Sequence, residues 1–198
     1  ARQIYIADHR AAGKMTKDMR KDRKLLRTSV YAIVDSNDFA VKDFSRAAEL
    51  YQMLYLDRYS WQNPQYTARY LAKAHEAGVL TLFGMRGPDG QLDGVGGVFR
   101  IGQSMTMPLL GLDTDKPKDI GLYRMLCAIA QDRAIADRLL YNRSAGAAGF
   151  KRNRGAVPAI EYTGVYVDHL GAGPRRATRA LAGILRRVGV PLLQRFAL

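Results

Sequence analysis

Apolar residues recur at intervals of three and four along two long segments of the chain, as they do on one face of an α-helix. A further segment is rich in helix formers, and another lies between helix start and stop signals. Helices are therefore expected over residues 14–27, 41–58, 64–78 and 121–138. In the third of these, we expect Asn63 to cap the helix, Pro64 to occupy its first turn and Gly78 to end it.

β-Branched and aromatic residues bounded by turn residues indicate strands in the remaining segments. These strands are expected over residues 28–36, 79–86, 91–102, 103–113, 139–145 and 156–168. Three of them follow one another between residues 79 and 113 and predict an antiparallel meander. The helix over 121–138 then lies between two strands, which is typical of a right-handed parallel crossover. The sequence therefore predicts an α/β (α+β) fold with a mixed, mostly antiparallel sheet. A crevice at the carboxyl end of the strand before the crossover is a common ligand position.

Charge changes this picture at the two ends of the chain. Residues 1–27 hold nine cations and three acids, residues 150–198 hold nine and two, and the middle holds thirteen of each. Excess positive charge of this kind favours an anionic partner, such as a phosphorylated cofactor, RNA or lipid head groups. The alternative is that these are solvated helix faces that favour solubility.

Composition excludes several classes of protein. Cys127 is the one cysteine and there are three histidines, so we expect neither an internal disulfide nor a metal cluster. No apolar run approaches the roughly 20 residues of a membrane span, and no secretory signal is evident. From these observations we expect a cytoplasmic protein.

Two candidate sites lie where the strand before the crossover meets the crossover helix. The first is an anion site at the N-terminus of that helix, where backbone amides are unpaired and the helix dipole is positive. It comprises Ile120, Gly121, Leu122, Tyr123 and Arg124, with added charge from Lys116 and Lys118. The alternative is an ordinary helix start capped by Asp119. The second candidate is Asp113, which is placed to accept a proton from an attacking amine. Its alternative role is to form a turn.

Further candidates lie after the crossover. Asn142 and Ser144 are two apart on a strand, so we expect both on one face, where they would polarise an acyl carbonyl or satisfy the strand end. Glu161 stands in an otherwise apolar strand, as a base of raised pKa or as the partner of an arginine. The stretch "NRSAGAAGFKRNRG" turns the chain between them, and we expect Lys151 to face outward toward phosphates.

The order of elements and several segments resemble the GNAT acyltransferases, in particular the Fem-like and BioF2-like (acetyltransferase 6) branch. The matching segments include "YSWQNPQY", "VLTLFGMRGPDGQLDGVGGVF" and "LYNRSAGAAGFKRNRGAVPAIEY". The resemblance implies a GNAT-like domain over residues 28–170, between a basic N-terminal segment and helix (1–27) and a basic amphipathic tail (171–198). The sequence departs from the family at the crossover helix, where "DKPKDIGLYR" replaces the glycine-rich signature for coenzyme A, and Phe150 stands where the family's tyrosine acid is usual.

The resemblance implies an N-acyltransferase that works by positioning and oxyanion stabilisation. Acyl-CoA or acetyl-CoA is the expected co-substrate, a small-molecule or peptide amine the acceptor, and no metal is needed. Fem-like relatives that use aminoacyl-tRNA also lack the coenzyme A signature, so that donor is the first alternative. A non-catalytic RNA-binding module, or a protein acting at a membrane surface through residues 174–198, are the others.

Overall fold

The computed structural model describes residues 1–11 and 13–196. Residue 12 of the expected N-terminal segment and residues 197–198 of the expected tail lie outside this part. The chain divides into a larger unit, Asp8–Asn142, and a smaller unit formed by Ala1–Ala7 with Arg143–Leu198. The predicted division into residues 1–27, 28–170 and 171–198 stays a prediction.

The strands of the larger unit follow the predicted order. They are β2 (Ala32–Val34), β3 (Thr81–Arg86), β4 (Leu92–Ile101), β5 (Ser104–Leu112) and β6 (Leu140–Asn142). Neighbours from β2 to β5 pair antiparallel, whereas β5 and β6 pair parallel, with Ser104 opposite Leu140 and Thr106 opposite Asn142. This arrangement confirms the predicted meander and the predicted parallel crossover.

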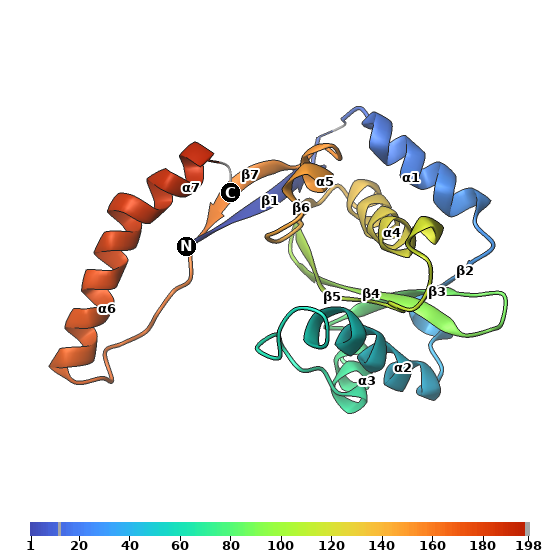
Figure 1. The fold of residues 1–198 in the computed structure, drawn as a ribbon, viewed down its shortest axis with the longest axis horizontal. Helices are drawn as coiled ribbons and strands as arrows, with labels where there is room; N and C mark the ends of the chain where they lie inside the picture. The colour runs from blue at the N-terminus through green and yellow to red at the C-terminus, as the bar shows by residue number, and fades with distance from the viewer. Residues whose placement is uncertain (12, 197–198) are drawn as a thin grey trace. The chain divides into compact units, whose positions relative to one another are not determined.

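Helices cover both faces of this sheet (Figure 1). They are α1 (Lys17–Thr28), α2 (Val41–Tyr51), α3 (Ala68–Glu76) and α4 (Leu122–Ala136), with short helical turns η1 (Ser36–Asp38), η2 (Gln52–Leu56) and η3 (Lys118–Ile120). α2 and α3 pack on one face, while α4 crosses the other and α1 packs on α4. The segment η2 is a π-helical turn that continues α2, a feature frequent at functional sites.

The start of α3 differs from the prediction. Thr67 caps this helix, because its hydroxyl accepts a hydrogen bond from the backbone N–H of Tyr70 at 3.1 Å. Asn63 instead donates its side-chain amide to the carbonyls of Tyr55 and Ser60 and so closes the preceding loop. The predicted cap at Asn63 was therefore wrong, since its amide satisfies loop carbonyls and leaves the capping role to Thr67.

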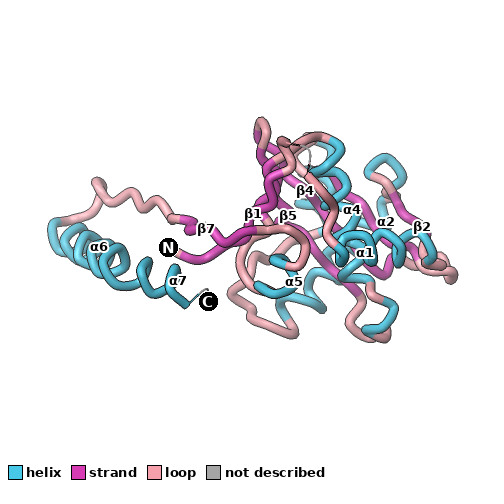
Figure 2. Tube along the Cα trace, turned by 90° about the horizontal axis from the view of Figure 1, so that it is seen from above, coloured by secondary structure: helices cyan, strands magenta, loops and turns pink. Residues whose placement is uncertain are grey.

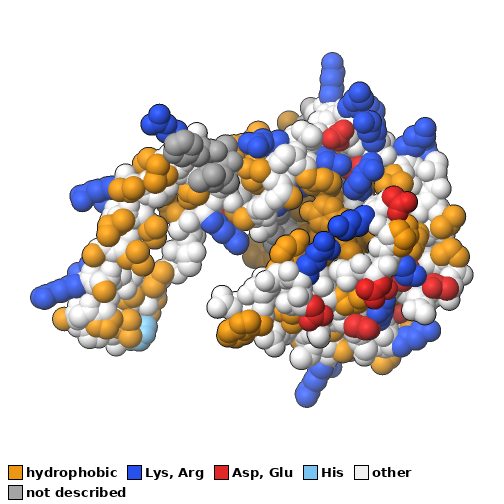
Figure 3. Space-filling view, viewed as in Figure 1, with side chains coloured by type: hydrophobic (Ala, Val, Ile, Leu, Met, Phe, Trp, Pro, Cys, Tyr) orange, Lys and Arg blue, Asp and Glu red, His pale blue; other side chains and the backbone are white. Residues whose placement is uncertain are grey.

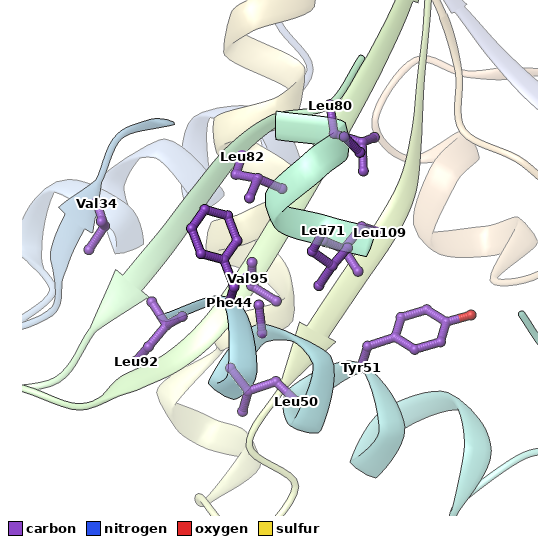
Figure 4. Close-up of a cluster of buried hydrophobic side chains, with 12 residues drawn as sticks. Val34, Phe44, Leu50, Tyr51, Leu71, Leu80, Leu82, Leu92, Val95 and Leu109 are labelled. Carbon is purple, nitrogen blue, oxygen red and sulfur yellow. The ribbon is translucent and has the colours of Figure 1, made fainter. Parts of the chain in front are cut away.

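The core of the larger unit lies between the sheet and the pair α2–α3. Aliphatic and aromatic side chains from both layers meet there, as Figure 4 shows. Gly111 on β5 allows this close contact, since a Cβ atom at its position would lie 2.6 Å from the backbone nitrogen of Tyr51. The glycine therefore sets how near α2 can approach the sheet.

The smaller unit joins the two ends of the chain. Its strands are β1 (Arg2–Asp8, whose last residue belongs to the larger unit) and β7 (Val157–Glu161), and its helices are α5 (Ala148–Arg152), α6 (Ala172–Ile184), η4 (Leu185–Gly189) and α7 (Val190–Phe196). β1 and β7 pair antiparallel and run side by side in Figure 2. Strand β1 was not predicted. The helical segment continues through Pro191, which lies in the first turn of α7, directly after the π-helical turn η4.

Candidate functional site

The N-terminus of the crossover helix α4 is closely covered by α1. Gly121 has φ of 78° and joins η3 to α4, a left-handed conformation that favours glycine. A Cβ atom at this position would lie 2.7 Å from Cδ2 of Leu25 on α1. Of the neighbouring candidates, Leu122 is buried, whereas Ile120 and Tyr123 are half-buried. The backbone geometry suits a helix start, and α1 occupies the space beside Gly121.

Two of the three cations expected around this helix end, Arg124 and Lys116, are already paired. Nε of Arg124 lies 2.7 Å from Oδ1 of Asp22, a buried carboxylate on α1. Lys116 lies 3.1 Å from Oδ2 of Asp93 and 3.6 Å from Asp89, and the hydrogen bond to Asp93 raises the pKa of its ammonium group. Two of the expected phosphate ligands are therefore neutralised by carboxylates, which weakens the pull of this helix end on an anion.

Asp113 follows β5 as predicted and is held in place by two contacts. Its Oδ2 accepts a hydrogen bond from Arg46 of α2 at 2.7 Å, and its Oδ1 accepts one from the backbone N–H of Asp115 at 3.0 Å. Burial opposes the charge of Arg46, but Glu49 and Asp113 outweigh it and raise the pKa of the guanidinium. The turn-forming role predicted as the alternative is thus present, together with an ion pair to the neighbouring helix.

Asp93 is a buried carboxylate that the sequence analysis did not identify as a candidate. It is fully buried on β4, and its Oδ2 accepts a hydrogen bond from the hydroxyl of Tyr31 at 2.9 Å. Its Oδ1 has no hydrogen-bond partner among the described residues. Burial, and then the hydrogen bond to Asp93, raise the pKa of Tyr31 to about 12. A lone carboxylate in the strand "LDGVGGVF" was the available signal.

The end of β6 separates Asn142 from Ser144. The parallel pairing stops at Asn142, which lies opposite Thr106. Ser144 belongs to the smaller unit and has φ of 59°, and its carbonyl accepts a hydrogen bond from the backbone N–H of Tyr5 at 3.1 Å. The prediction that both side chains share one strand face was therefore wrong, because the strand ends before Ser144 and the backbone turns left-handed.

Lys151 was expected to face outward, but it is buried. Its ammonium group donates to the carbonyls of Ser144 at 3.0 Å and Ala145 at 2.6 Å. These carbonyls belong to a turn in which two non-glycine residues, Ser144 and Ala147, have positive φ. Such strained backbone persists only when its surroundings hold it, and it clusters at functional sites. Lys151 is one of the groups that hold this turn.

Glu161 lies at the end of β7, directly opposite Arg2 of β1. Its Oε2 is 2.5 Å from Nε of Arg2, in a partly exposed ion pair. Glu161 is therefore paired with an arginine, which was the alternative role predicted for it.

The outer face of α1, the helix that packs on α4, carries five exposed cations. Its exposed cations recur at three- and four-residue intervals and are Lys17, Arg20, Lys21, Lys24 and Arg27. Figure 3 shows Lys and Arg side chains gathered over this helix. The opposite face packs on α4 through the buried Met19 and the pairs Asp22–Arg124 and Arg23–Asp132. The five cations, here called the α1 basic face, therefore project away from the sheet.

Within the described ranges, 1–11 and 13–196, no cluster of three or more His, Cys, Asp or Glu residues could hold a metal ion. No helix in this part of the chain is both long and apolar enough to cross a membrane.

Comparison with solved structures finds similar folds at low sequence identity. The crystal structure of FemX superposes with a TM-score of 0.62 at 9% identity, over 79% of this chain and 59% of FemX. L-PGS from Bacillus licheniformis gives 0.58 at 11% identity, over 79% of this chain and 57% of that protein. The C-terminal DUF2156 domain of a putative lysylphosphatidylglycerol synthetase from Agrobacterium fabrum gives 0.50 at 15%, over 72% and 45% of the two chains.

These likenesses show the fold: the chain has a mixed, mostly antiparallel sheet flanked by helices, as predicted, and shares this fold with FemX. The chain spans less than two thirds of the length of each of these proteins. No family model matches the sequence, and no curated protein matches it either.

Proposed function

We propose that the protein is an aminoacyltransferase that takes its aminoacyl group from an aminoacyl-tRNA. The fold it shares with FemX and with lysylphosphatidylglycerol synthetases supports this donor better than the acyl-CoA donor expected first. In the reaction, an acceptor amine attacks the carbonyl carbon of the aminoacyl ester. The new acyl–nitrogen bond forms as the bond to the ribose oxygen of tRNA breaks, and the amine proton passes to that oxygen.

The observation that carries this proposal is the α1 basic face. Five exposed cations on one helix face form a positive surface, and contacts between Lys or Arg side chains and phosphates are the main source of affinity for nucleic acid. Asp22, one of the two acids of this helix, is buried against Arg124 on the opposite side and so does not neutralise this face. A polyanion such as tRNA therefore has a charged surface available beside the crossover helix.

The crossover helix supports the same choice of donor. A coenzyme A pyrophosphate needs free amides and unpaired charge at a helix N-terminus. Here Leu25 occupies the space beside Gly121, and Arg124 and Lys116 are bound to carboxylates. These contacts make the N-terminus of α4 a poor site for a pyrophosphate. Phosphates are better bound by the α1 basic face.

Transferases of this kind need few reactive side chains, because they work by positioning and by stabilising the oxyanion. In the larger unit, Asn142 remains our candidate for contact with the ester carbonyl, and Asp113 for holding the acceptor amine in place of its present partner Arg46. In the smaller unit, Ser144 and Glu161 remain candidates for the same two roles, with Glu161 exchanging Arg2 for the amine. Lys151 would act as a positioning residue, since it fixes the carbonyls of the turn that contains Ser144.

The first test is tRNA binding by the chain and by the triple variant Lys17→Gln, Lys21→Gln, Lys24→Gln. Each phosphate contact contributes about 0.7–0.9 to the slope of log affinity against log salt. We therefore expect the triple variant to bind tRNA at least about tenfold more weakly at low salt, with a slope reduced by about 2. The matched control, with Lys42, Arg58 and Arg69 changed to Gln, should bind as the parent does. Equal losses in both variants would contradict a specific role for α1.

The second test separates the donors. The chain is incubated with a general amine and with labelled aminoacyl-tRNA, acetyl-CoA or longer acyl-CoA, and the labelled amide is measured. Amide formed from aminoacyl-tRNA alone supports the proposal. Amide formed only from a CoA thioester would overturn it and restore the acyl-CoA interpretation. Binding of tRNA without transfer from any donor would favour the RNA-binding module.

A further inference from the structure

A continuous apolar stripe lies exposed along the C-terminal helices of the smaller unit. Its members recur at intervals of three and four residues through α6, η4 and α7, and are Leu181, Ile184, Leu185, Val188 and Leu192. Leu181 is 57% exposed, Ile184 61% and Val188 54%. Soluble proteins rarely expose contiguous apolar surface of this kind unless it meets a partner.

The stripe is not the side of the helix that the smaller unit uses for its own packing. Val190 is buried, and the carbonyl of Leu193 accepts a hydrogen bond from the side-chain amide of Gln3 on β1 at 3.2 Å. The hydrogen bond from Gln3 attaches α7 to β1. The exposed stripe is therefore apolar surface in addition to the buried Val190 of the same helical segment.

Charge identifies the partner that this surface fits. Residues 171–198 contain six arginines and no acidic residue. Arg176, Arg179, Arg186 and Arg187 are exposed, and on a helical projection they fall outside the arc of the apolar stripe. In Figure 3, hydrophobic side chains cover much of the visible face of α6, and Lys and Arg side chains project from its edge. An arginine-rich polar face with an aliphatic opposite face is the pattern of a helix that lies in the interface of an anionic bilayer.

We propose that α6, η4 and α7 bind the surface of a membrane that contains anionic lipid. The apolar stripe lies at the level of the acyl-chain boundary, and the arginines contact the lipid head groups. Long arginine side chains suit this geometry, because their aliphatic parts stay near the apolar phase while the guanidinium reaches the head groups. This inference does not depend on aminoacyl transfer.

The test is flotation of the chain with lipid vesicles in the absence of tRNA. Vesicles of phosphatidylcholine with about one third phosphatidylglycerol present the anionic surface, and vesicles of pure phosphatidylcholine present the neutral one. We expect binding to the anionic vesicles to be at least about tenfold stronger, and to weaken with added salt. Equal binding to both, or no binding to either, would overturn the proposal.

Two sets of variants locate the surface. Leu181→Asp with Ile184→Asp should abolish flotation, whereas the control Val41→Asp, at an 88% exposed residue of the larger unit, should leave it unchanged. Arg179→Gln with Arg186→Gln and Arg187→Gln should weaken binding to anionic vesicles and reduce its salt dependence. Circular dichroism must show parent-like helix content for each variant. If the aspartate pair abolishes self-association of the chain but leaves flotation intact, the stripe joins two copies and the proposal fails.

Discussion

At the scale of single residues, the part-buried hydrogen bond from Tyr31 to the buried Asp93 predicts a contribution to stability. Asp93 is fully buried, its Oδ2 is held by Tyr31 and Lys116, and its Oδ1 has no partner within the described part of the chain. Hydrogen bonds to a charged acceptor contribute about 1.5–3 kcal/mol to the free energy of unfolding. Because Tyr31 is partly exposed, we expect its hydrogen bond to contribute an amount toward the low end of this range. Replacing Tyr31 by Phe should therefore lower the free energy of unfolding by about 1–2 kcal/mol.

Urea unfolding of Tyr31→Phe measures this loss. The matched control is Tyr59→Phe. Tyr59 is 69% exposed, so loss of its hydroxyl does not remove a hydrogen bond from a buried carboxylate. A loss in the control as large as in Tyr31→Phe would show that the hydrogen bond to Asp93 is not the cause.

At the scale of elements, the packing of α2 on β5 depends on the absence of a side chain at Gly111. A Cβ atom there would meet the backbone of Leu50 and Tyr51 at 2.7 and 2.6 Å, and helix backbone cannot move aside as a flexible side chain can. We expect Gly111→Ala to lower the free energy of unfolding by about 1–3 kcal/mol, as overpacking does.

Thermal or urea unfolding of Gly111→Ala checks this expectation. Gly164→Ala is the control, since a Cβ atom at Gly164 would have no neighbour within 4 Å among the described residues. If both variants unfold like the parent, α2 can shift from the sheet without cost and Gly111 does not set the contact.

At the scale of the whole molecule, buried and half-buried tyrosines make the free energy of unfolding depend on pH in the alkaline range. Burial is the main cause that raises the pKa of Tyr31 and of Tyr51 from 10.0 to about 12, and it also raises the pKa of Tyr55 and Tyr66. Between pH 10 and 12 the folded chain then binds more protons than the unfolded chain. The free energy of unfolding must fall through this window, since stability decreases with pH where the folded state holds more protons.

Ultraviolet absorbance of tyrosinate measures this effect in the folded and the urea-unfolded chain. We expect some tyrosines of the folded chain to titrate near pH 12, and all tyrosines of the unfolded chain to titrate near pH 10. Coincident titration curves for the two states would contradict the prediction. In the variant Tyr31→Phe, the late-titrating group should be smaller by one tyrosine.

The sequence by itself determined the main helices and strands of the larger unit and their order. The apolar periodicity of residues 41–58 and 121–138 predicts α2 with η2 and predicts α4, and the turns between residues 79 and 113 predict the meander. These features depend on neighbours a few positions away, which sequence shows directly. The basic ends and the position of Asp113 at the end of β5 were equally readable.

Only the tertiary structure decided which partner each charged group has. Arg46 binds Asp113, Asp22 binds Arg124, and Lys151 turns inward to hold the carbonyls near Ser144. These contacts depend on how elements pack against one another or on a left-handed turn. Element packing and left-handed turns produce no periodic pattern in the sequence. The pairing of β1 with β7 joins residues more than 150 positions apart, and only the closed fold brings them together. Periodicity places a residue on a face, whereas packing decides what that face meets.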